Sequence, residues 1–82
     1  MKILLKPLGI PLEGLDPEPI VMDLKENATI QDMMVELMNQ HPQLTPEHFR
    51  TTSFLIQGKK ADEASILSEG DKVLLLRMLG GG

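Results

Sequence analysis

The sequence contains no cysteine, tryptophan or tyrosine, and its aromatic residues are Phe49 and Phe54 alone. The absence of cysteine excludes a disulfide framework, thiolate metal ligands and a cysteine nucleophile, and it fits a reducing compartment. The scarcity of aromatic rings removes the platforms on which bases of single-stranded nucleic acids stack. The core must therefore be built from Leu, Ile, Val and Met side chains.

Positive charge is also scarce, because eight Lys and Arg residues face twelve Asp and Glu residues, for a formal net charge of −4. Nucleic acid is therefore a poor candidate partner, since phosphate contacts require clustered Lys and Arg. The apolar run that follows Met1 is too short for a signal peptide or a membrane span. We expect a cytoplasmic protein that binds neither nucleic acid nor membranes.

Residue patterning predicts strand, strand, helix, strand, short strand and strand. Alternation of apolar residues favours strands over residues 1–5 and 20–24, paired antiparallel across a polar loop rich in Pro and Gly. In the helix, Thr29 is the expected N-cap with Asp32 as its capping-box partner, and Pro42 ends it. An apolar stripe predicts the buried side of this helix: Ile30, Met33, Met34, Leu37 and Met38.

The second half of the sequence predicts short strands separated by turns. We expect a strand over residues 54–56, a turn made by Gln57-Gly58, an ill-defined short stretch over 61–67, a turn at 68–71 and a last strand over 72–79. Lys59 and Lys60 are interpreted as solvated residues of the hairpin turn. One helix can cover only one face of the sheet. The expectation is an α+β domain over residues 1–79, with a mixed sheet of four to five strands and a flexible glycine tail over 80–82.

The last strand is unusual because nearly all its residues are apolar, as in strands that are buried on both faces at the centre of a sheet. We expect Val73 and Leu75 to face the helix. Leu74 and Leu76, together with Leu4, would then lie on the open face and form a surface for a partner protein. The alternative interpretation is that loops cover these leucines.

The chain given ends in Gly80-Gly81-Gly82. Residues without a Cβ can pass through a narrow slot, and three of them extend by on the order of 10 Å. A terminal carboxylate is ionised at neutral pH and is a poor electrophile, so chemistry at Gly82 requires activation, for which adenylation by ATP is the natural route. A sulfur nucleophile could then displace AMP and leave a thiocarboxylate. A fraying terminus and a cloning scar are the other interpretations.

Three segments together carry a family resemblance across essentially the whole chain. Ala28-Thr29-Ile30-Gln31-Asp32 opens the helix, Phe54-Leu55-Ile56-Gln57-Gly58 ends a strand in a turn, and Glu69-Gly70-Asp71-Lys72-Val73 leads into the last strand. With the terminal glycines, this order resembles the ThiS/MoaD family of sulfur-carrier proteins, which have the ubiquitin-like β-grasp fold.

The resemblance implies that the chain is a carrier and not an enzyme, with no bound cofactor or metal. A MoeB/ThiF-like enzyme of the ubiquitin-activating type would consume ATP to adenylate Gly82, with Gly80 and Gly81 as the threading segment. The resulting thiocarboxylate would donate sulfur through a MoaE-like or ThiG-like synthase subunit. Molybdopterin or tungstopterin synthesis is favoured slightly over thiamin synthesis, and the chain could be the small subunit of a molybdopterin-synthase-type complex.

The expected partner surface also includes Arg77 and Met78, between the leucines and the glycines, where Arg77 is placed to meet an acidic groove that leads into a partner's active site. Two departures leave the subfamily open, because the Pro-Pro-Val stretch common in MoaD-like tails is missing and a third glycine is present. Leu74-Leu75-Leu76-Arg77 also resembles the end of ubiquitin. An alternative function is therefore a protein modifier that forms isopeptide bonds through Gly82, and another is a β-grasp interaction module without chemistry. His41 and His48 are interpreted as solvated loop residues, not as a metal site.

Overall fold

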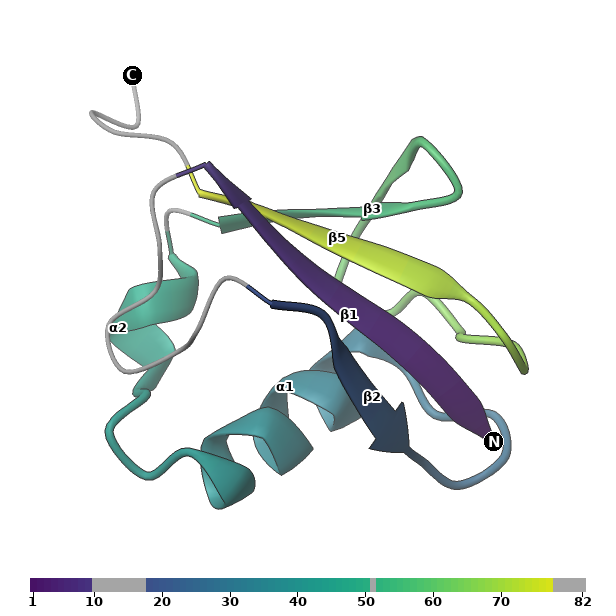
Figure 1. The fold of residues 1–82 in the computed structure, drawn as a ribbon, viewed down its shortest axis with the longest axis horizontal. Helices are drawn as coiled ribbons and strands as arrows, with labels where there is room; N and C mark the ends of the chain where they lie inside the picture. The colour runs from purple at the N-terminus through teal and green to yellow at the C-terminus, as the bar shows by residue number, and fades with distance from the viewer. Residues whose placement is uncertain (10–17, 51, 78–82) are drawn as a thin grey trace.

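The computed structural model describes residues 1–9, 18–50 and 52–77, which form one mixed sheet with one main helix across it (Figure 1). Within these ranges the expected α+β class is confirmed. Strand order across the sheet is β2-β1-β5-β3-β4. The elements, in chain order, are β1 (Lys2–Gly9), β2 (Ile20–Asp23), α1 (Ile30–Gln40), α2 (Pro46–Phe49), β3 (Thr52–Ile56), β4 (Lys59–Ala61) and β5 (Lys72–Arg77).

The last strand, β5, lies at the centre of the sheet, as its continuous apolar composition predicts. It pairs in parallel with β1, where Leu5 is opposite Val73, and antiparallel with β3, where Phe54 is opposite Leu75. The expected antiparallel pairing of the first two strands is also confirmed, with Ile3 opposite Met22. The first and last strands, β1 and β5, thus lie side by side in the sheet.

The first strand is longer than its pattern predicts, because β1 continues through Pro7 to Gly9. Expecting a loop from Pro7 onward was wrong. Leu4 and the other even-numbered residues of β1 direct their backbone groups toward β5, as the bond from the Leu4 N–H to the Asp71 carbonyl (2.9 Å) shows. Pro7 therefore faces the β2 side, and the pairing with β2 has already ended at Leu5 and Ile20. A proline fits there because no ladder bond needs its missing N–H.

Helix α1 begins as its sequence predicts. The Asp32 N–H donates to Thr29 Oγ1 (3.2 Å), and the Thr29 N–H donates to Asp32 Oδ2 (3.0 Å), which completes a capping box. The hydrogen bond from the Thr29 backbone holds the pKa of the Asp32 carboxyl below its ordinary value of 3.8. The predicted stripe is confirmed: Ile30, Met33, Met34 and Leu37 are buried and Met38 is half-buried.

Two elements in the middle of the chain differ from expectation. Residues around Pro46 and His48 form the one-turn helix α2 instead of a loop, and His48 Nδ1 accepts a bond from the Thr45 N–H (3.0 Å) at its start. Lys59 and Lys60 belong to strand β4, not to the turn. The turn itself is confined to Gln57 and Gly58, both with positive φ (52° and 81°), as in a tight hairpin.

Alternate residues of the central strands divide between the two faces of the sheet. Val73 (0% exposed) and Leu75 (2%) pack into the core with Leu5 (0%), whereas their neighbours in sequence point to the other side. The remaining core comes from α1, β2, β3, α2 and the connecting loops: Met22, Leu24, Ala28, Leu44, Phe49, Phe54 and Leu67, among others. The core is therefore a single layer between the sheet and α1.

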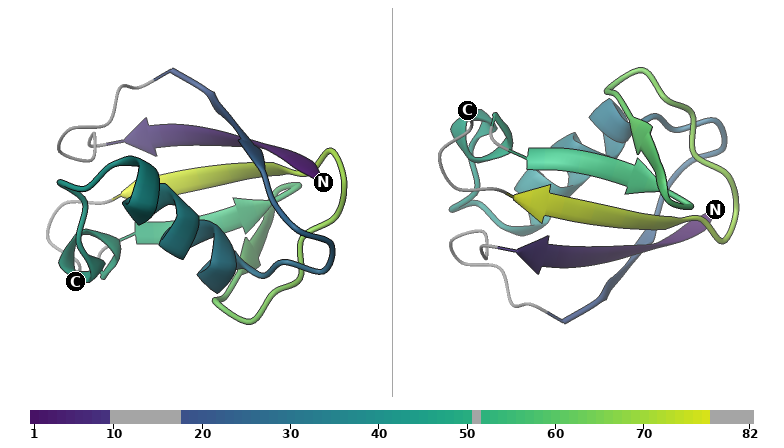
Figure 2. Two further views of the ribbon diagram at one scale, coloured as in Figure 1. Left: turned by 90° about the horizontal axis from the view of Figure 1, so that it is seen from below. Right: turned by 90° about the horizontal axis from the view of Figure 1, so that it is seen from above.

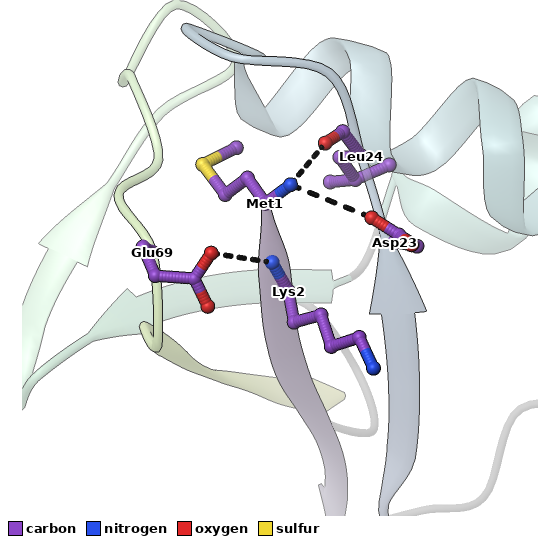
Figure 3. Close-up of polar contacts among 5 residues, drawn as sticks. All are labelled: Met1, Lys2, Asp23, Leu24 and Glu69. Atoms are coloured by element: carbon purple, nitrogen blue, oxygen red, sulfur yellow. Dashed lines mark hydrogen bonds and ion pairs between the residues drawn. The ribbon is translucent and has the colours of Figure 1, made fainter.

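The corner where β1 begins is tied to both neighbouring segments (Figure 3). The α-amino group of Met1 donates to the Leu24 carbonyl (2.9 Å) and lies 3.4 Å from Asp23 Oδ1. The Lys2 N–H donates to Glu69 Oε1 (3.1 Å), in the turn that precedes β5. These contacts fix the start of β1 between β2 and β5.

Candidate functional site: the open face of the sheet

The sheet face opposite α1 carries the three leucines expected there. Leu4, Leu74 and Leu76 alternate with core residues of β1 and β5, and each is half-buried. Figure 2 (right) looks onto this face, with β5 between β1 and β3 and α1 behind the sheet. The predicted orientation of the last strand is therefore correct, whereas the role of these leucines in binding remains a prediction.

The structure adds two leucines that the sequence interpretation missed. Leu55 of β3 is opposite Leu74, and Leu8 of β1 is opposite Leu76, so both side chains lie on the open face. Leu8 is 37% exposed. We call the set the leucine face: Leu4, Leu8, Leu55, Leu74 and Leu76. Leu8 was missed because Pro7 was interpreted as the end of the strand, and Leu55 because its register with β5 is not visible in its own segment.

Positive charge surrounds the leucine face. Four of the eight Lys and Arg residues of the chain lie on this side of the sheet, from three edges of the apolar patch: Lys2, Lys6, Lys60 and Lys72. Among the strand residues described, Asp23 is the acid on the same side, and its carboxylate lies 3.4 Å from the Met1 ammonium. This face of an acidic protein is therefore basic, and it complements a partner surface with an apolar centre and acidic rim.

The turn before β5 fixes which leucines face outward. Asp71 is 6% exposed, and its carboxylate accepts bonds from the Ser68 N–H (2.8 Å) and from Gln57 Nε2 (3.2 Å). Gly70 takes a positive φ of 82°, and its N–H donates to the Lys2 carbonyl (2.7 Å). Because a slip of one residue would exchange the two faces of a strand, these bonds determine that Leu74 and Leu76 remain outside the core.

The leucine face is continuous along the chain with the expected reactive tail. β5 ends at Arg77, whose backbone pairs with Gly9 on one side and Thr52 on the other. Met78 and the tail residues Gly80, Gly81 and Gly82 lie outside the described residues, so their expected roles stay predictions. The boundary placed at residue 79 falls in the same range.

A metal site finds no support in the part of the chain that the structure describes. There, no group of three or more His, Cys, Asp or Glu side chains is placed to hold a metal ion. His48 is occupied at the start of α2, and His41 is the C-cap of α1.

A separate question is whether the chain could cross a membrane through a helix. None of the helices in the described ranges is long and apolar enough to do so.

Known structures share this arrangement of elements. SAMP1 (small archaeal modifier protein 1) from Haloferax volcanii superimposes with a TM-score of 0.79 at 19% identity, over 100% of both chains. A putative molybdopterin converting factor subunit 1 from Pyrococcus furiosus gives a TM-score of 0.71 at 20% identity, over 95% of this chain and 98% of that one. The chain has a ThiS/MoaD-like β-grasp fold.

A third structure with the β-grasp fold is a complex. The subunit of the Helicobacter pylori molybdopterin-converting factor that matches, crystallised as a complex of subunits 1 and 2, has a TM-score of 0.65 at 16% identity over 100% of both chains. No protein-family model and no curated protein sequence matches this chain. The likeness therefore concerns the fold, which agrees with the family resemblance of the sequence.

Proposed function

We propose that this β-grasp protein is a sulfur carrier whose C-terminal glycine is activated as an acyl adenylate and converted to a thiocarboxylate. One observation carries the proposal: the central strand β5 presents the leucine face and then leads directly into the segment that contains Gly80, Gly81 and Gly82. The surface that a partner would bind and the group on which it would act thus belong to one continuous stretch of chain.

The proposed chemistry takes place on the carrier, in the active site of another protein. Residues 78–82 can extend at most about 17 Å beyond Arg77, which is enough to enter a partner's active site while the leucine face is docked. Attack of the Gly82 carboxylate on the α-phosphate of ATP would release pyrophosphate and form an acyl adenylate. A sulfur nucleophile would then displace AMP. The carrier supplies the carboxylate and the docking surface, and the partner supplies catalysis.

Two kinds of partner follow from this proposal. The first is a MoeB/ThiF-like adenylating enzyme, and the second is a synthase subunit that takes the sulfur, MoaE-like or ThiG-like. A MoaE-like subunit is favoured because one solved structure of this fold is a complex of subunits 1 and 2 of a molybdopterin-converting factor. The product would then be a molybdopterin or tungstopterin, with thiamin synthesis as the second candidate.

Intact mass spectrometry tests the carrier chemistry directly. The full chain is incubated with a purified adenylating enzyme from the same organism, ATP and a sulfide donor. We expect an increase of about 16 Da, the difference between sulfur and oxygen, which deletion of Gly82 abolishes. If an enzyme that is active on its own carrier produces no such change, the proposal is wrong.

Two variants separate docking from threading. Leu74→Asp should weaken binding to the adenylating enzyme, because it places a carboxylate in an apolar contact. Gly81→Ala should bind normally but react slowly, because the added Cβ obstructs a narrow channel. Binding is measured by titration calorimetry, and adenylation by pyrophosphate release. A Gly81→Ala protein that adenylates at the normal rate would contradict the threading role.

Modification of other proteins is the second candidate function. It is favoured by the similarity to SAMP1, which is described as a modifier protein. The acyl adenylate is the same intermediate, but a lysine amine instead of sulfide would displace AMP and form an isopeptide bond. In the mass experiment, covalent adducts to lysines of added cellular proteins, dependent on Gly82, would distinguish this function from sulfur transfer.

A further inference from the structure

The outer edge of the sheet at β2 carries backbone groups that point away from β1. Met1 and Leu24 exchange two bonds, since the Leu24 N–H donates to the Met1 carbonyl (2.7 Å) and the Met1 amino group donates to Leu24 (2.9 Å; Figure 3). In an antiparallel pair such residues alternate. Met22 therefore also faces β1, whereas the N–H and C=O groups of Val21 and Asp23 point away from the sheet. Among the described residues, none bonds to these outward groups.

A groove lies beside this edge, between the end of β2 and the flank of α1. It has a volume of about 310 Å³ and an apolar floor formed by Leu24, Ala28 and Val35. Val35 is 44% exposed although it is a large apolar residue on a helix, and Val21 on the edge strand is 66% exposed. A strand added beside β2 would direct alternate side chains into the groove and cover Val35.

The walls of the groove are acidic. Asp32 and Glu36 line it from α1, Asp23 lies at its β2 edge with a side chain on the open face of the sheet, and Lys25 is the one basic residue of the lining. The Thr29 backbone N–H, which donates to Asp32 Oδ2 (3.0 Å), holds the pKa of that carboxyl below its ordinary value of 3.8. The groove therefore favours apolar side chains that are flanked by positive charge.

The opposite edge of the sheet is built differently. The edge strand β4 has only three residues, and two of them are the exposed lysines Lys59 and Lys60. Short edge strands with lysine discourage pairing with another chain. Only β2, of the two edges, combines outward backbone groups with a neighbouring apolar groove.

We propose that the edge of β2 and the acidic groove beside it bind an extended peptide segment of another protein by strand addition. The segment would carry two or three consecutive β-branched apolar residues flanked by Lys or Arg. Its backbone would pair with Val21 and Asp23, one apolar side chain would enter the groove over Val35, and the basic residues would meet Asp23 and Glu36. This site adjoins the leucine face, because Val21 is opposite Leu4, but the groove over Val35 lies on the α1 side of the sheet.

A second copy of this chain is a poorer occupant than a basic peptide. Antiparallel pairing of two β2 edges would bring the acidic grooves of both copies together, and like charges at this spacing repel. The observed charges therefore favour a basic partner of a different sequence.

The test uses the full-length ¹⁵N-labelled protein and the peptide acetyl-Ser-Lys-Val-Ile-Val-Arg-Ser-amide as probe. We expect saturable shifts of the Val21 and Asp23 amide signals and slower hydrogen exchange at both. A peptide with Glu in place of Lys and Arg should bind at least tenfold more weakly, and one with Pro in place of the central Ile should not bind. Equal affinity for the charge-reversed peptide, shifts confined to the leucine face, or no shift at millimolar peptide would overturn the proposal.

Variants in the groove keep the test specific. Val35→Lys should lower the affinity at least tenfold, whereas the same change at Ile66, another exposed apolar residue that does not line the groove, should leave it within twofold. Val21→Pro removes one outward N–H without removing a bond to β1, and Val21→Thr is its control. If Val21→Pro fails to fold, the Val35→Lys comparison still decides the question.

Two further measurements complete the test. Deletion of Gly82 should leave peptide binding unchanged, so failure here is distinct from failure of the carrier chemistry. Sedimentation equilibrium should show a monomer in which the β2 signals do not depend on protein concentration. A dimer paired through β2 would overturn the proposal, because the occupant would then be a second copy.

Discussion

The two faces of the sheet are made from alternate residues of the same strands, yet they differ in nearly every physical property. The face under α1 is apolar and buried at its centre, where Val73 and Leu75 lie. The leucine face is half-buried and surrounded by lysines such as Lys60 and Lys72. Similar side chains thus stabilise the fold on one side and remain available to a partner on the other. Five predictions test how far this division of roles holds.

The largest effect is expected from one substitution made at adjacent positions. Leu75→Asp would bury a carboxylate in an apolar core, at a cost of more than about 4 kcal/mol, which approaches the whole stability of a small domain. Leu74→Asp can reach water and should cost about 1 kcal/mol. Urea unfolding followed by circular dichroism measures both. Equal losses would show that the open face is covered as tightly as the core.

The next effect concerns the turn that sets the register of β5. Asp71→Asn removes an acceptor from the bonds to Ser68 and Gln57 and should lower the free energy of unfolding by about 1–3 kcal/mol. The control is Asp62→Asn, in an exposed turn where the carboxylate accepts a bond from the Ala64 N–H (2.9 Å). We expect the control to change stability by less than half as much. If both variants lose the same free energy of unfolding, the buried hydrogen bonds of Asp71 contribute no more to stability than the exposed ones of Asp62.

A smaller effect is expected at the start of α1, the element that makes one face different from the other. Thr29→Ala should cost about 1 kcal/mol through loss of the cap. Adding Asp32→Asn to that variant should cost little more, because the two residues share the same bonds. Urea unfolding of the two single variants and of the double variant measures this, and fully additive losses would contradict the shared cap.

The cap also predicts a pH dependence with a definite sign. The pKa of Asp32 is lower in the folded protein than its ordinary value of 3.8, so the unfolded chain binds its proton more readily. The stability that the ionised carboxylate contributes is therefore present above pH 3.8 and is lost as the pH falls through the lower folded value. The difference between wild type and Asp32→Asn should shrink across that range in unfolding experiments. A constant difference would contradict the assignment.

The smallest effect on stability is expected from the charges around the leucine face. Lys60→Glu should change the free energy of unfolding by less than about 0.5 kcal/mol, because the side chain is exposed. It should slow association with an acidic partner several-fold at low salt, and added salt should reduce the difference. Lys59→Glu, the neighbour on the other face of β4, is the control and should leave the association rate unchanged. Stopped-flow binding to the adenylating enzyme measures both, and equal slowing would show that net charge alone matters.

Local sequence patterns predict the structure correctly wherever a few neighbouring residues decide it. The capping box of Thr29 and Asp32, the buried stripe of α1 and the turn at Gly70 follow from residues within one or two turns of one another. The two-sided character of β5 was also predictable, because a single helix cannot cover both faces of a sheet. From these features the sequence predicts that Leu4, Leu74 and Leu76 lie on the open face.

Features that depend on distant strands could not be predicted from the pattern. Pro7 can belong to β1 because the pairing of β1 with β2 stops at Leu5. Leu55 lies on the leucine face because the register of β3 and β5 places it opposite Leu74. The one-turn helix α2 is too short to show a period of its own. Lys59 and Lys60 were assigned to a turn because polar residues after Gly58 look alike in a turn and in an edge strand.

Local sequence patterns specify the order of the strands, the main helix and its buried side, and the strand that leads into the terminal glycines. Each of these follows from periodicity, capping or turn chemistry within a short segment. The positions of the lysines around the leucine face, and of the acidic groove beside β2, follow from the packing of the folded protein. The reason is that strand neighbours and register are set by packing against α1 and by long-range backbone bonds, so residues far apart in the sequence become one surface only when the sheet is complete.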